Sequence, residues 1–326
     1  MSARQKILSV LTDGESHTSA EIASVLGLSP GTVRRHVRAL IRLGLDIRRI
    51  SLREYRSCAL FRPLDRGNIL NHLSVQAPTV TVPLHLCEQV DSTNLYLLKK
   101  AERGQCLSGT TCVAEAQRAG RGQRGRSWVA TPYCNIMLSM AWWLDSKAAS
   151  LAGLSLAAGV AMARGLVDYG IAGVGLKWPN DILWRQRKLG GVLVDVHRRG
   201  SMEILAIVGV GLNGFLAEQD GVRIGQGWTD LRRITGEAVD RDRLVALVIK
   251  RLYEMLETFQ QTGFAHFRID WEQLHVSQGQ RVRVFSKQET VAGRALGVDD
   301  DGALRIMNDD CRTQVFRSGE ISVRVE

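Results

Sequence analysis

The sequence lacks the features that mark secreted, membrane-spanning and metal-binding proteins. Its six cysteines form no CxxC pair and have no histidine at the spacing of metal ligands, so we expect free thiols rather than a zinc site or structural disulfides. No apolar run approaches the length of a membrane span, and the amino-terminal residues do not resemble a secretion signal. We therefore expect a cytoplasmic protein with no membrane partner.

The sequence also offers no persuasive Ser, His and Asp set, or Cys and His pair, for nucleophilic catalysis. The composition is otherwise ordinary. Hydrophobic residues make up 45% and charged residues 23% of the 326 residues, which indicates a globular protein of two or three domains. The net charge is +10, and residues 1–66 carry +6 of it. This uneven charge indicates an anionic partner for the amino-terminal part.

A helix-turn-helix pattern occupies that basic part. Thr18 with Glu21 forms a capping box that starts one helix, which ends at Gly27, and Ser29 with Pro30 suits the start of the next. We expect this second helix to bind DNA, because its polar side chains point away from its apolar face. The expected contacts are Ser29, Thr32, Arg34, Arg35 and Arg38. The alternative is a small helical bundle with a solvated basic face.

A stretch rich in glycine and arginine, QRAGRGQRGRSW, runs from Gln117 to Trp128. Glycine lets the backbone approach a ligand closely and point its N–H groups at an anion. Arginine matches phosphate or carboxylate oxygens two at a time. The stretch therefore predicts a flexible loop that closes on a polyphosphate or an acyl phosphate. The alternative is a solvated basic loop or a nucleic-acid-binding arm.

A second pattern, KWPND, runs from Lys177 to Asp181. A lysine at a strand end offers a charge for a phosphate or carboxylate, proline ends the strand ladder, and Asn-Asp forms a turn whose carboxylate is able to hold Mg²⁺. The turn from Arg187 to Val194, RKLGGVLV, then leads into an apolar strand. Alone, this second turn would be an ordinary hairpin.

Together the two stretches resemble the biotin–protein ligases, whose hallmarks are a GRGxxGR loop and a KWPND turn followed by K-x-x-G-[IV]-L. The resemblance extends through the whole chain. Asp91–Asn94 is similar to the family's biotin-contacting DSTN segment, Ile207–Asn213 to its glycine-containing strand beside the ligand, and Gly227–Leu231 to a loop that orders over the adenine.

The resemblance implies an ATP-dependent ligase. Biotin and ATP with Mg²⁺ give biotinyl-5′-AMP, and a lysine of the biotin carboxyl carrier protein of acetyl-CoA carboxylase then takes the biotin. It also implies a repressor of biotin biosynthesis, which binds operator DNA as a homodimer when the adenylate is present as corepressor. Neither chemical step needs a protein nucleophile, so the site has to neutralise charge and position the reactants.

The resemblance also implies a role for individual residues. Arg121 and Lys177 carry the electrostatic part of catalysis. Biotin contacts are implied for Ser92, Thr93, Asn94, Gln117, Gly120, Arg121, Gly122, Gln123, Lys177 and Gly190. Contacts with ATP or the adenylate are implied for Arg121, Arg124, Asn180, Asn213 and Trp228. Asp181 is the implied Mg²⁺ ligand.

Two positions depart from the family pattern. Gln123 stands where the family usually carries arginine, so we expect looser retention of the adenylate. Leu45–Phe61 alternates as the β-hairpin wing of a winged helix does, but Ser51–Arg56 replaces the family's glycine-rich turn. Arg53 and Arg56 are able to contact phosphates in its place.

These patterns predict an α+β protein of several domains. We expect a winged helix-turn-helix at 1–66, a linker at 67–80, a mixed α/β ligase domain of the class II synthetase type at 81–273, and a small SH3-like β-barrel at 274–326. Long helices are expected over 148–169 and 241–261. Rival functions are a biotin-sensing regulator without ligase activity, a lipoate ligase on a related fold, and a non-specific nucleic-acid binder.

Overall fold

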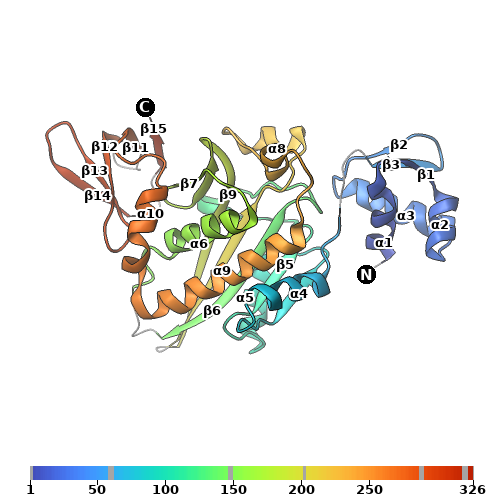
Figure 1. The fold of residues 1–326 in the computed structure, drawn as a ribbon, viewed down its shortest axis with the longest axis horizontal. Helices are drawn as coiled ribbons and strands as arrows, with labels where there is room; N and C mark the ends of the chain where they lie inside the picture. Colours follow the sequence, from blue (N-terminus) through green and yellow to red (C-terminus); the bar gives the residue numbers. More distant parts are fainter. Residues whose placement is uncertain are drawn as a thin grey trace.

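The computed structural model describes residues 3–57, 62–145, 150–200, 203–285, 290–317 and 322–325. The amino-terminal domain lies at one end of the molecule, the small carboxy-terminal β domain at the other, and the central domain between them (Figure 1). This arrangement agrees with the expected order of a winged helix-turn-helix, an α/β ligase domain and a β domain.

The amino-terminal domain consists of three helices and a three-stranded sheet in the order β1-β3-β2. Its elements are α1 (Ala3–Val10), the short η1 (Leu11–Asp13), β1 (Ser16–Thr18), α2 (Ser19–Leu26), α3 (Pro30–Arg42), β2 (Ile47–Arg49) and β3 (Glu54–Ser57). Strands β2 and β3 form the expected wing. The last residues of the predicted wing, 58–61, lie outside the described residues.

Local capping explains why α2 and α3 begin where the sequence predicts. Thr18 Oγ1 accepts from the Glu21 backbone N at 3.2 Å, and Glu21 Oε2 accepts from the Thr18 N at 2.7 Å, which completes the capping box. Ser29 Oγ accepts from the Thr32 N at 3.1 Å, with Pro30 in the first turn. The helix-turn-helix prediction is thereby confirmed.

The central domain is built on a seven-stranded mixed sheet in the order β4-β5-β6-β10-β9-β8-β7, in which only the β4–β5 pair is parallel among the described strands. The strands are β4 (Leu84–Cys87), β5 (Thr111–Ala114), β6 (Ile136–Asp145), β7 (Val174–Lys177), β8 (Asp181–Trp184), β9 (Arg187–Arg199) and β10 (Glu203–Leu212). The helices are α4 (Arg66–Gln76), α5 (Thr93–Glu102), α6 (Leu154–Tyr169), α7 (Glu218–Gly221), α8 (Leu231–Thr235) and α9 (Arg241–Thr262), with short turns η2 (Gln123–Gly125), η3 (Val222–Ile224) and η4 (Phe264–Phe267).

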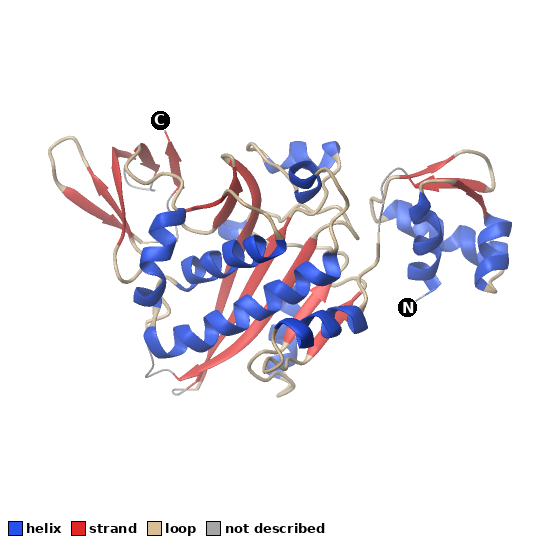
Figure 2. Ribbon diagram, viewed as in Figure 1, coloured by secondary structure: helices blue, strands red, loops and turns tan. Residues whose placement is uncertain are grey.

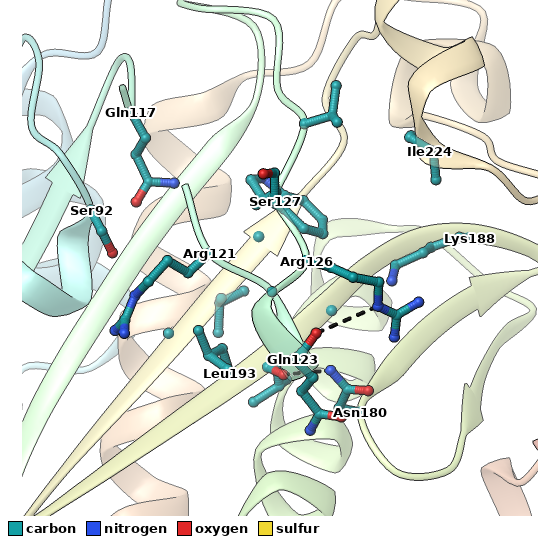
Figure 3. A pocket seen from close by; sticks show the side chains of 18 of the residues that line it. Ser92, Gln117, Arg121, Gln123, Arg126, Ser127, Asn180, Lys188, Leu193 and Ile224 are labelled. Atoms are coloured by element: carbon teal, nitrogen blue, oxygen red, sulfur yellow. Dashed lines mark hydrogen bonds between the residues drawn. The ribbon is translucent and has the colours of Figure 1, made fainter. Parts of the chain in front are cut away.

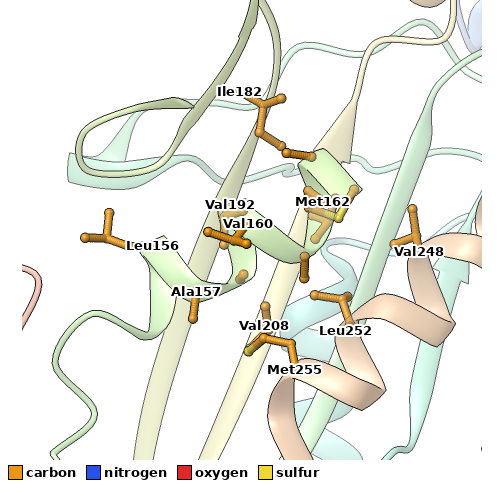
Figure 4. Close-up of a cluster of buried hydrophobic side chains, with 14 of the residues drawn as sticks. Leu156, Ala157, Val160, Met162, Ile182, Val192, Val208, Val248, Leu252 and Met255 are labelled. Carbon is orange, nitrogen blue, oxygen red and sulfur yellow. The ribbon is translucent and has the colours of Figure 1, made fainter. Parts of the chain in front are cut away.

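Both faces of this sheet are covered. Helices α6 and α9 lie across one face (Figure 2), where Val160 and Leu252 meet sheet residues such as Val208 (Figure 4). The neighbouring strand residue Ile207 belongs instead to a cluster with Leu97 of α5. Successive strand residues point to opposite faces, so α5 packs on the other side of the sheet. The sheet is thus a rigid platform with apolar cover on both sides.

The segment expected to be a linker, 67–80, is instead part of the central domain. It contains most of α4, whose N-cap Asp65 accepts from the Asn68 N at 3.0 Å. Ile69 and Leu73 are fully or almost fully buried on one side of that helix. The linker assignment was wrong because the polar residues between these two apolar ones hid a helical face with a spacing of four.

Helix α6 begins later than expected. The predicted start at 148 lies outside the described residues, and the helix itself starts at Leu154. Gly153 precedes it with φ of 75°, a left-handed conformation that favours glycine. A Cβ at this position would lie 2.4 Å from the Phe264 ring, so the close approach also requires glycine.

The carboxy-terminal domain is a five-stranded antiparallel sheet in the order β14-β13-β12-β11-β15. Its elements are β11 (Arg281–Phe285), β12 (Thr290–Val298), β13 (Leu304–Met307), β14 (Thr313–Phe316) and β15 (Ser322–Val325), preceded by α10 (Arg268–Leu274). The Trp178 Nε1 donates to the Gly302 O at 3.0 Å, which fastens this domain beside the KWPND turn. Among the described residues, no helix is long and apolar enough to cross a membrane.

Candidate functional site

A cavity of about 300 Å³ lies on the central sheet beneath the Gly/Arg loop, which we define as Gly120–Arg126 (Figure 3). Strands β9 and β10 form its floor. The DSTN segment lies on one side of it, and the start of β9, which carries Lys188, lies on the other. Its lining residues are Ser92, Thr93, Asn94, Gln117, Arg121, Gly122, Gln123, Arg126, Ser127, Trp128, Val129, Asn180, Lys188, Gly191, Val192, Leu193, Gly209, Val210, Gly211, Asn213, Arg223, Ile224 and Gln226.

Two glycines of β10 shape the floor. A Cβ at Gly209 would lie 2.3 Å from Asn94 Oδ1, and a Cβ at Gly211 would lie 2.4 Å from the Trp128 ring. No side chain larger than hydrogen fits at either position while those partners stay in place. The glycine strand therefore lets a polar amide and an indole lie directly on the sheet.

One end of the cavity is polar and buried. Ser139 Oγ lies 2.7 Å from Thr93 Oγ1 and 2.5 Å from Asn94 Oδ1, and the Thr93 N donates to Gln117 Oε1 at 2.8 Å. Thr93, Asn94 and Ser139 are at most 4% exposed. A buried polar set of this kind is held in one orientation by its own hydrogen bonds, so it suits a neutral polar group of a ligand.

The other end is cationic. Lys188 Nζ lies 2.6 Å from Asp181 Oδ1 and 5.9 Å from the centre of the Trp128 ring, and its side chain is only 15% exposed. Figure 3 shows Arg126 beside Lys188, whereas Arg121 points to the Ser92 side of the cavity. The sheltered lysine, with the exposed Arg126 beside it, suits the charge of a phosphate or a carboxylate.

The Gly/Arg loop folds as a small hairpin of its own. The Gly122 N donates to the Arg126 O at 2.7 Å, and the Trp128 N donates to the Gly120 O at 2.9 Å. At the tip, Arg124 has φ of 59° and the next residue, Gly125, has φ of 71°. The loop therefore carries its arginines on a preformed turn rather than on an extended arm.

Most of the residues implied by the family resemblance meet in this cavity. Those that line it are Ser92, Thr93, Asn94, Gln117, Arg121, Gly122, Gln123, Asn180 and Asn213. Those that lie outside the lining are Gly120, Arg124, Lys177, Asp181, Gly190 and Trp228. Gly190 packs against β10, where a Cβ would lie 2.6 Å from the Gly211 O, so its place in the sequence serves strand packing.

Three of the outlying residues lie close to the cavity all the same. Asp181 forms an ion pair with Lys188, which lines the cavity. Lys177 pairs with Asp181 in the β7–β8 register, and burial lowers the pKa of its ammonium group below the ordinary value. The Trp228 ring lies against Gly221 and under the Arg233 guanidinium, 4.0 Å from the ring centre, on the loop that borders the cavity.

Among the lining residues that sequence reasoning missed are Arg126, Ser127, Trp128 and Lys188. A signal for Lys188 was available, since it is the lysine of the K-x-x-G-[IV]-L pattern. The signal for Trp128 was its place at the end of the Gly/Arg stretch. Only the fold shows that these two side chains meet over β10.

The expected DNA-contacting residues lie on or next to α3. Ser29, Arg35 and Arg38 are exposed, and Thr32 and Arg34 are half-buried. Ser29 Oγ also lies 3.0 Å from Thr32 Oγ1, so these two residues cap the helix as well as facing outward. The arrangement leaves a basic helix face open at the end of the molecule.

Metal ligands and disulfides are not evident in the described parts of the chain. No group of three or more His, Cys, Asp or Glu side chains is placed to hold a metal ion there. The described cysteines are free: Cys87, Cys106, Cys112, Cys134 and Cys311.

Three sequence families match the chain. The biotin/lipoate A/B protein ligase family matches residues 86–213, a winged helix-turn-helix DNA-binding family matches residues 3–45, and the biotin protein ligase C-terminal domain matches residues 278–324.

Individual relatives agree with these matches. The chain is 33% identical to the bifunctional ligase/repressor BirA of Escherichia coli over 319 residues, which cover 98% of this chain and 96% of the relative. It is 32% identical over 264 residues to the biotin–[acetyl-CoA-carboxylase] ligase of Mycobacterium tuberculosis, covering 79% and 95% of the two chains. Its fold is similar to that of the biotin protein ligase from Aquifex aeolicus in complex with biotin and ATP, with a TM-score of 0.63, 28% identity and coverage of 74% and 99%. The chain therefore belongs to the biotin–protein ligase family, in its bifunctional ligase/repressor form.

Proposed function

We propose that the protein is an ATP-dependent biotin–protein ligase that also represses transcription. The cavity with one buried polar end and one cationic end carries this proposal. Biotin has the matching shape, since a neutral polar ureido ring stands at one end of the molecule and a carboxylate at the other. The names of the relatives, a ligase/repressor and a ligase for acetyl-CoA carboxylase, support it.

The reaction has two steps. A biotin carboxylate oxygen attacks the α-phosphorus of ATP, a new P–O bond forms, and pyrophosphate leaves. The amine of a carrier lysine then attacks the carbonyl carbon of biotinyl-5′-AMP, loses its proton and displaces AMP. The partner is the biotin carboxyl carrier protein of acetyl-CoA carboxylase. Transfer of biotin to that carrier, followed by intact mass spectrometry, tests the function directly.

The position of each residue in the cavity determines the role that we assign to it. Thr93, Asn94 and Gln117 hold the ureido ring, with Ser92 at the edge of the same end. Lys188 and Arg126 neutralise the charge that develops on the α-phosphate. Asn180 of the KWPND turn and Asn213, which directly follows β10, line the cavity and form the side that binds the adenylate. Trp228, on the loop that borders the cavity, completes that side.

The KWPND turn offers a carboxylate that would hold an Mg²⁺ ion bound with the nucleotide. Asp181 is the carboxylate beside the cationic end, and its Oδ1 already pairs with Lys188 at 2.6 Å. One carboxylate does not complete the shell of an Mg²⁺ ion, which favours oxygen ligands and is commonly shared with substrate phosphates. We assign Asp181, with Asn180 beside it, to holding the ion, which supplies further charge neutralisation when bound.

Replacing Gln123 with arginine is expected to slow adenylate release about fivefold. Gln123 lines the cavity on the loop above the cationic end, and a charged donor bonds a phosphate more strongly than an amide does, by about 1 kcal/mol. The measurement is the dissociation rate of biotinyl-5′-AMP from Gln123→Arg. Gln105→Arg adds the same charge at an exposed loop away from the cavity and is the control. An unchanged rate in Gln123→Arg would contradict the assignment.

The amino-terminal domain acts as the regulatory part. When no carrier protein takes the biotin, the bound adenylate favours a homodimer, and two helix-turn-helix domains then bind a palindromic operator. Two-fold symmetry of the protein would match two half-sites in the DNA. The exposed arginines of α3 and the family match at residues 3–45 support this role.

Substitution of Arg35 or Arg38 by alanine is expected to weaken operator binding several-fold. Each substitution should also reduce the slope of log affinity against log salt concentration by about one, which corresponds to one lost phosphate contact. A gel shift with a biotin-biosynthesis promoter, with and without biotin and ATP, is the measurement. Arg198→Ala removes an exposed arginine of β9 instead and should bind as the wild type does. Binding that ignores biotin and ATP would argue against a corepressor role.

Two rival functions are less well supported. A biotin sensor without ligase activity would not require a site for the phosphates of ATP, which the Gly/Arg loop and Lys188 provide beside the carboxylate. A lipoate ligase would share the fold family, but the relatives cited above are biotin ligases. Competition between biotin and lipoate for adenylation separates this second rival from the proposal.

A further inference from the structure

A carboxylate outside the main cavity joins the Gly/Arg loop to the central sheet. Asp195, on β9, accepts with Oδ2 from Arg121 Nη2 and, at 3.0 Å, from Asn94 Nδ2. The Asp195 side chain is 20% exposed and the Arg121 side chain 40% exposed. One carboxylate oxygen thus binds a residue of the loop and a residue of the buried polar end together.

The side-chain amide of Asn94 is fixed by further hydrogen bonds. Its Oδ1 lies 2.5 Å from Ser139 Oγ, and its Nδ2 also donates to the Leu193 O at 3.4 Å. Gly209 leaves the space that the amide occupies. The amide therefore has one orientation, with its N–H groups toward Asp195 and its oxygen toward Ser139. Asp195 stands at the end of this hydrogen-bonded chain.

The loop itself does not pack down on β9. A second cavity, of about 550 Å³, lies between them and is lined by loop residues and by Leu193, Val194 and Asp195. The backbone hydrogen bonds of the loop join it to itself and, at its neck, to the Asp91 O through the Ala119 N. The contact between Arg121 and Asp195 therefore spans a gap that backbone bonding leaves open.

We propose that Asp195 is a positioning residue that latches the Gly/Arg loop over the cavity through Arg121 and fixes the amide of Asn94 below it. Arg121 consequently serves loop closure, while Lys188 and Arg126 supply the charge at the phosphate. The latch belongs to the free protein; its effect on adenylate retention rests on the proposed function. Two substitutions separate its two contacts. Asp195→Asn removes the charge that holds Arg121 but keeps a carbonyl acceptor for Asn94, and Asp195→Ala removes both.

Limited proteolysis of the ligand-free protein tests the latch without any catalysis. Trypsin cleavage after Arg124 and Arg126 is expected to be about fivefold faster in Asp195→Asn, because a partly exposed ion pair contributes about 1 kcal/mol to the closed state. Asp270→Asn breaks a similar, partly exposed pair with Arg164 on α6 and α10, away from the cavity, and should leave loop cleavage unchanged. Equal cleavage rates in wild type and Asp195→Asn would overturn the latch.

Kinetics then test the two contacts separately. Asp195→Asn is expected to release biotinyl-5′-AMP about fivefold faster with a KM for biotin near the wild-type value, whereas Asp195→Ala should also raise that KM about tenfold. Adding Arg121→Gln to Asp195→Asn should give no further loss, since both remove one interaction. Fully additive losses would overturn the proposal. Wild-type protein that forms no adenylate would count against the ligase function, and the proteolysis result would still decide the latch.

Discussion

Replacing Lys188 with methionine is expected to lower the rate of adenylate formation by about 100- to 1,000-fold. Removing one preorganised group that stabilises charge in a transition state has an effect of this order. Lys188 is the sheltered cation of the cavity, with a side chain 15% exposed. Its loss would also leave the Asp181 carboxylate, now without its partner at 2.6 Å, beside the negative phosphates. Pyrophosphate release with biotin and ATP measures this rate.

Lys250→Met is the matched control, since Lys250 lies on α9 and does not line the cavity. It should retain the wild-type rate. Thermal unfolding of Lys188→Met should show an intact fold, because methionine retains most of the length and volume of the lysine stem. A folded Lys188→Met that forms adenylate within threefold of the wild-type rate would refute the assigned role.

Substitution of Glu115 by glutamine is expected to destabilise the central domain by about 3–5 kcal/mol. Glu115 is fully buried and pairs with Arg241, which is 7% exposed, at 2.8 Å between Oε2 and Nη1. Removal of one partner leaves the other charge buried and uncompensated, which is the costly way to break such a pair. The same two side chains also bind the backbone of the segment that precedes α4. The Leu64 N donates to Glu115, and Arg241 donates to the Arg62 O at 2.6 Å.

Urea unfolding of Glu115→Gln measures this loss. The control is Asp309→Asn, which breaks the exposed pair with Arg281 at 2.7 Å and should change stability by less than about 1 kcal/mol. Equal stabilities of Glu115→Gln and the wild type would show that the buried pair contributes nothing to the central domain.

Features with local causes could be predicted from the sequence. The capping box at Thr18 and the Ser29–Pro30 start place two helices within a residue or so, because a helix start depends on neighbours three residues away. The Gly/Arg loop and the KWPND turn were recognisable for the same reason. Their letters are contiguous, so they could be identified before the fold was known.

Features with distant partners could not be predicted. Asp195 lies 74 residues from Arg121, and Glu115 lies 126 residues from Arg241. No spacing rule connects residues so far apart, and only the order of strands in the sheet brings them together. Helix α4 was not predicted for a different reason: its buried face has few apolar residues, and they lie within a polar segment.

In the proposed function, one site joins biotin to ATP and passes the biotin to a carrier protein. The most direct test is intact mass spectrometry of the protein incubated with biotin, Mg²⁺, ATP and an apo biotin-carrier domain. We predict a mass gain of one biotin on a single lysine of the carrier, with biotinyl-5′-AMP formed on the way. Adenylate without transfer would contradict ligase function and leave a biotin sensor. Absence of any adenylate would contradict the assignment of the cavity itself.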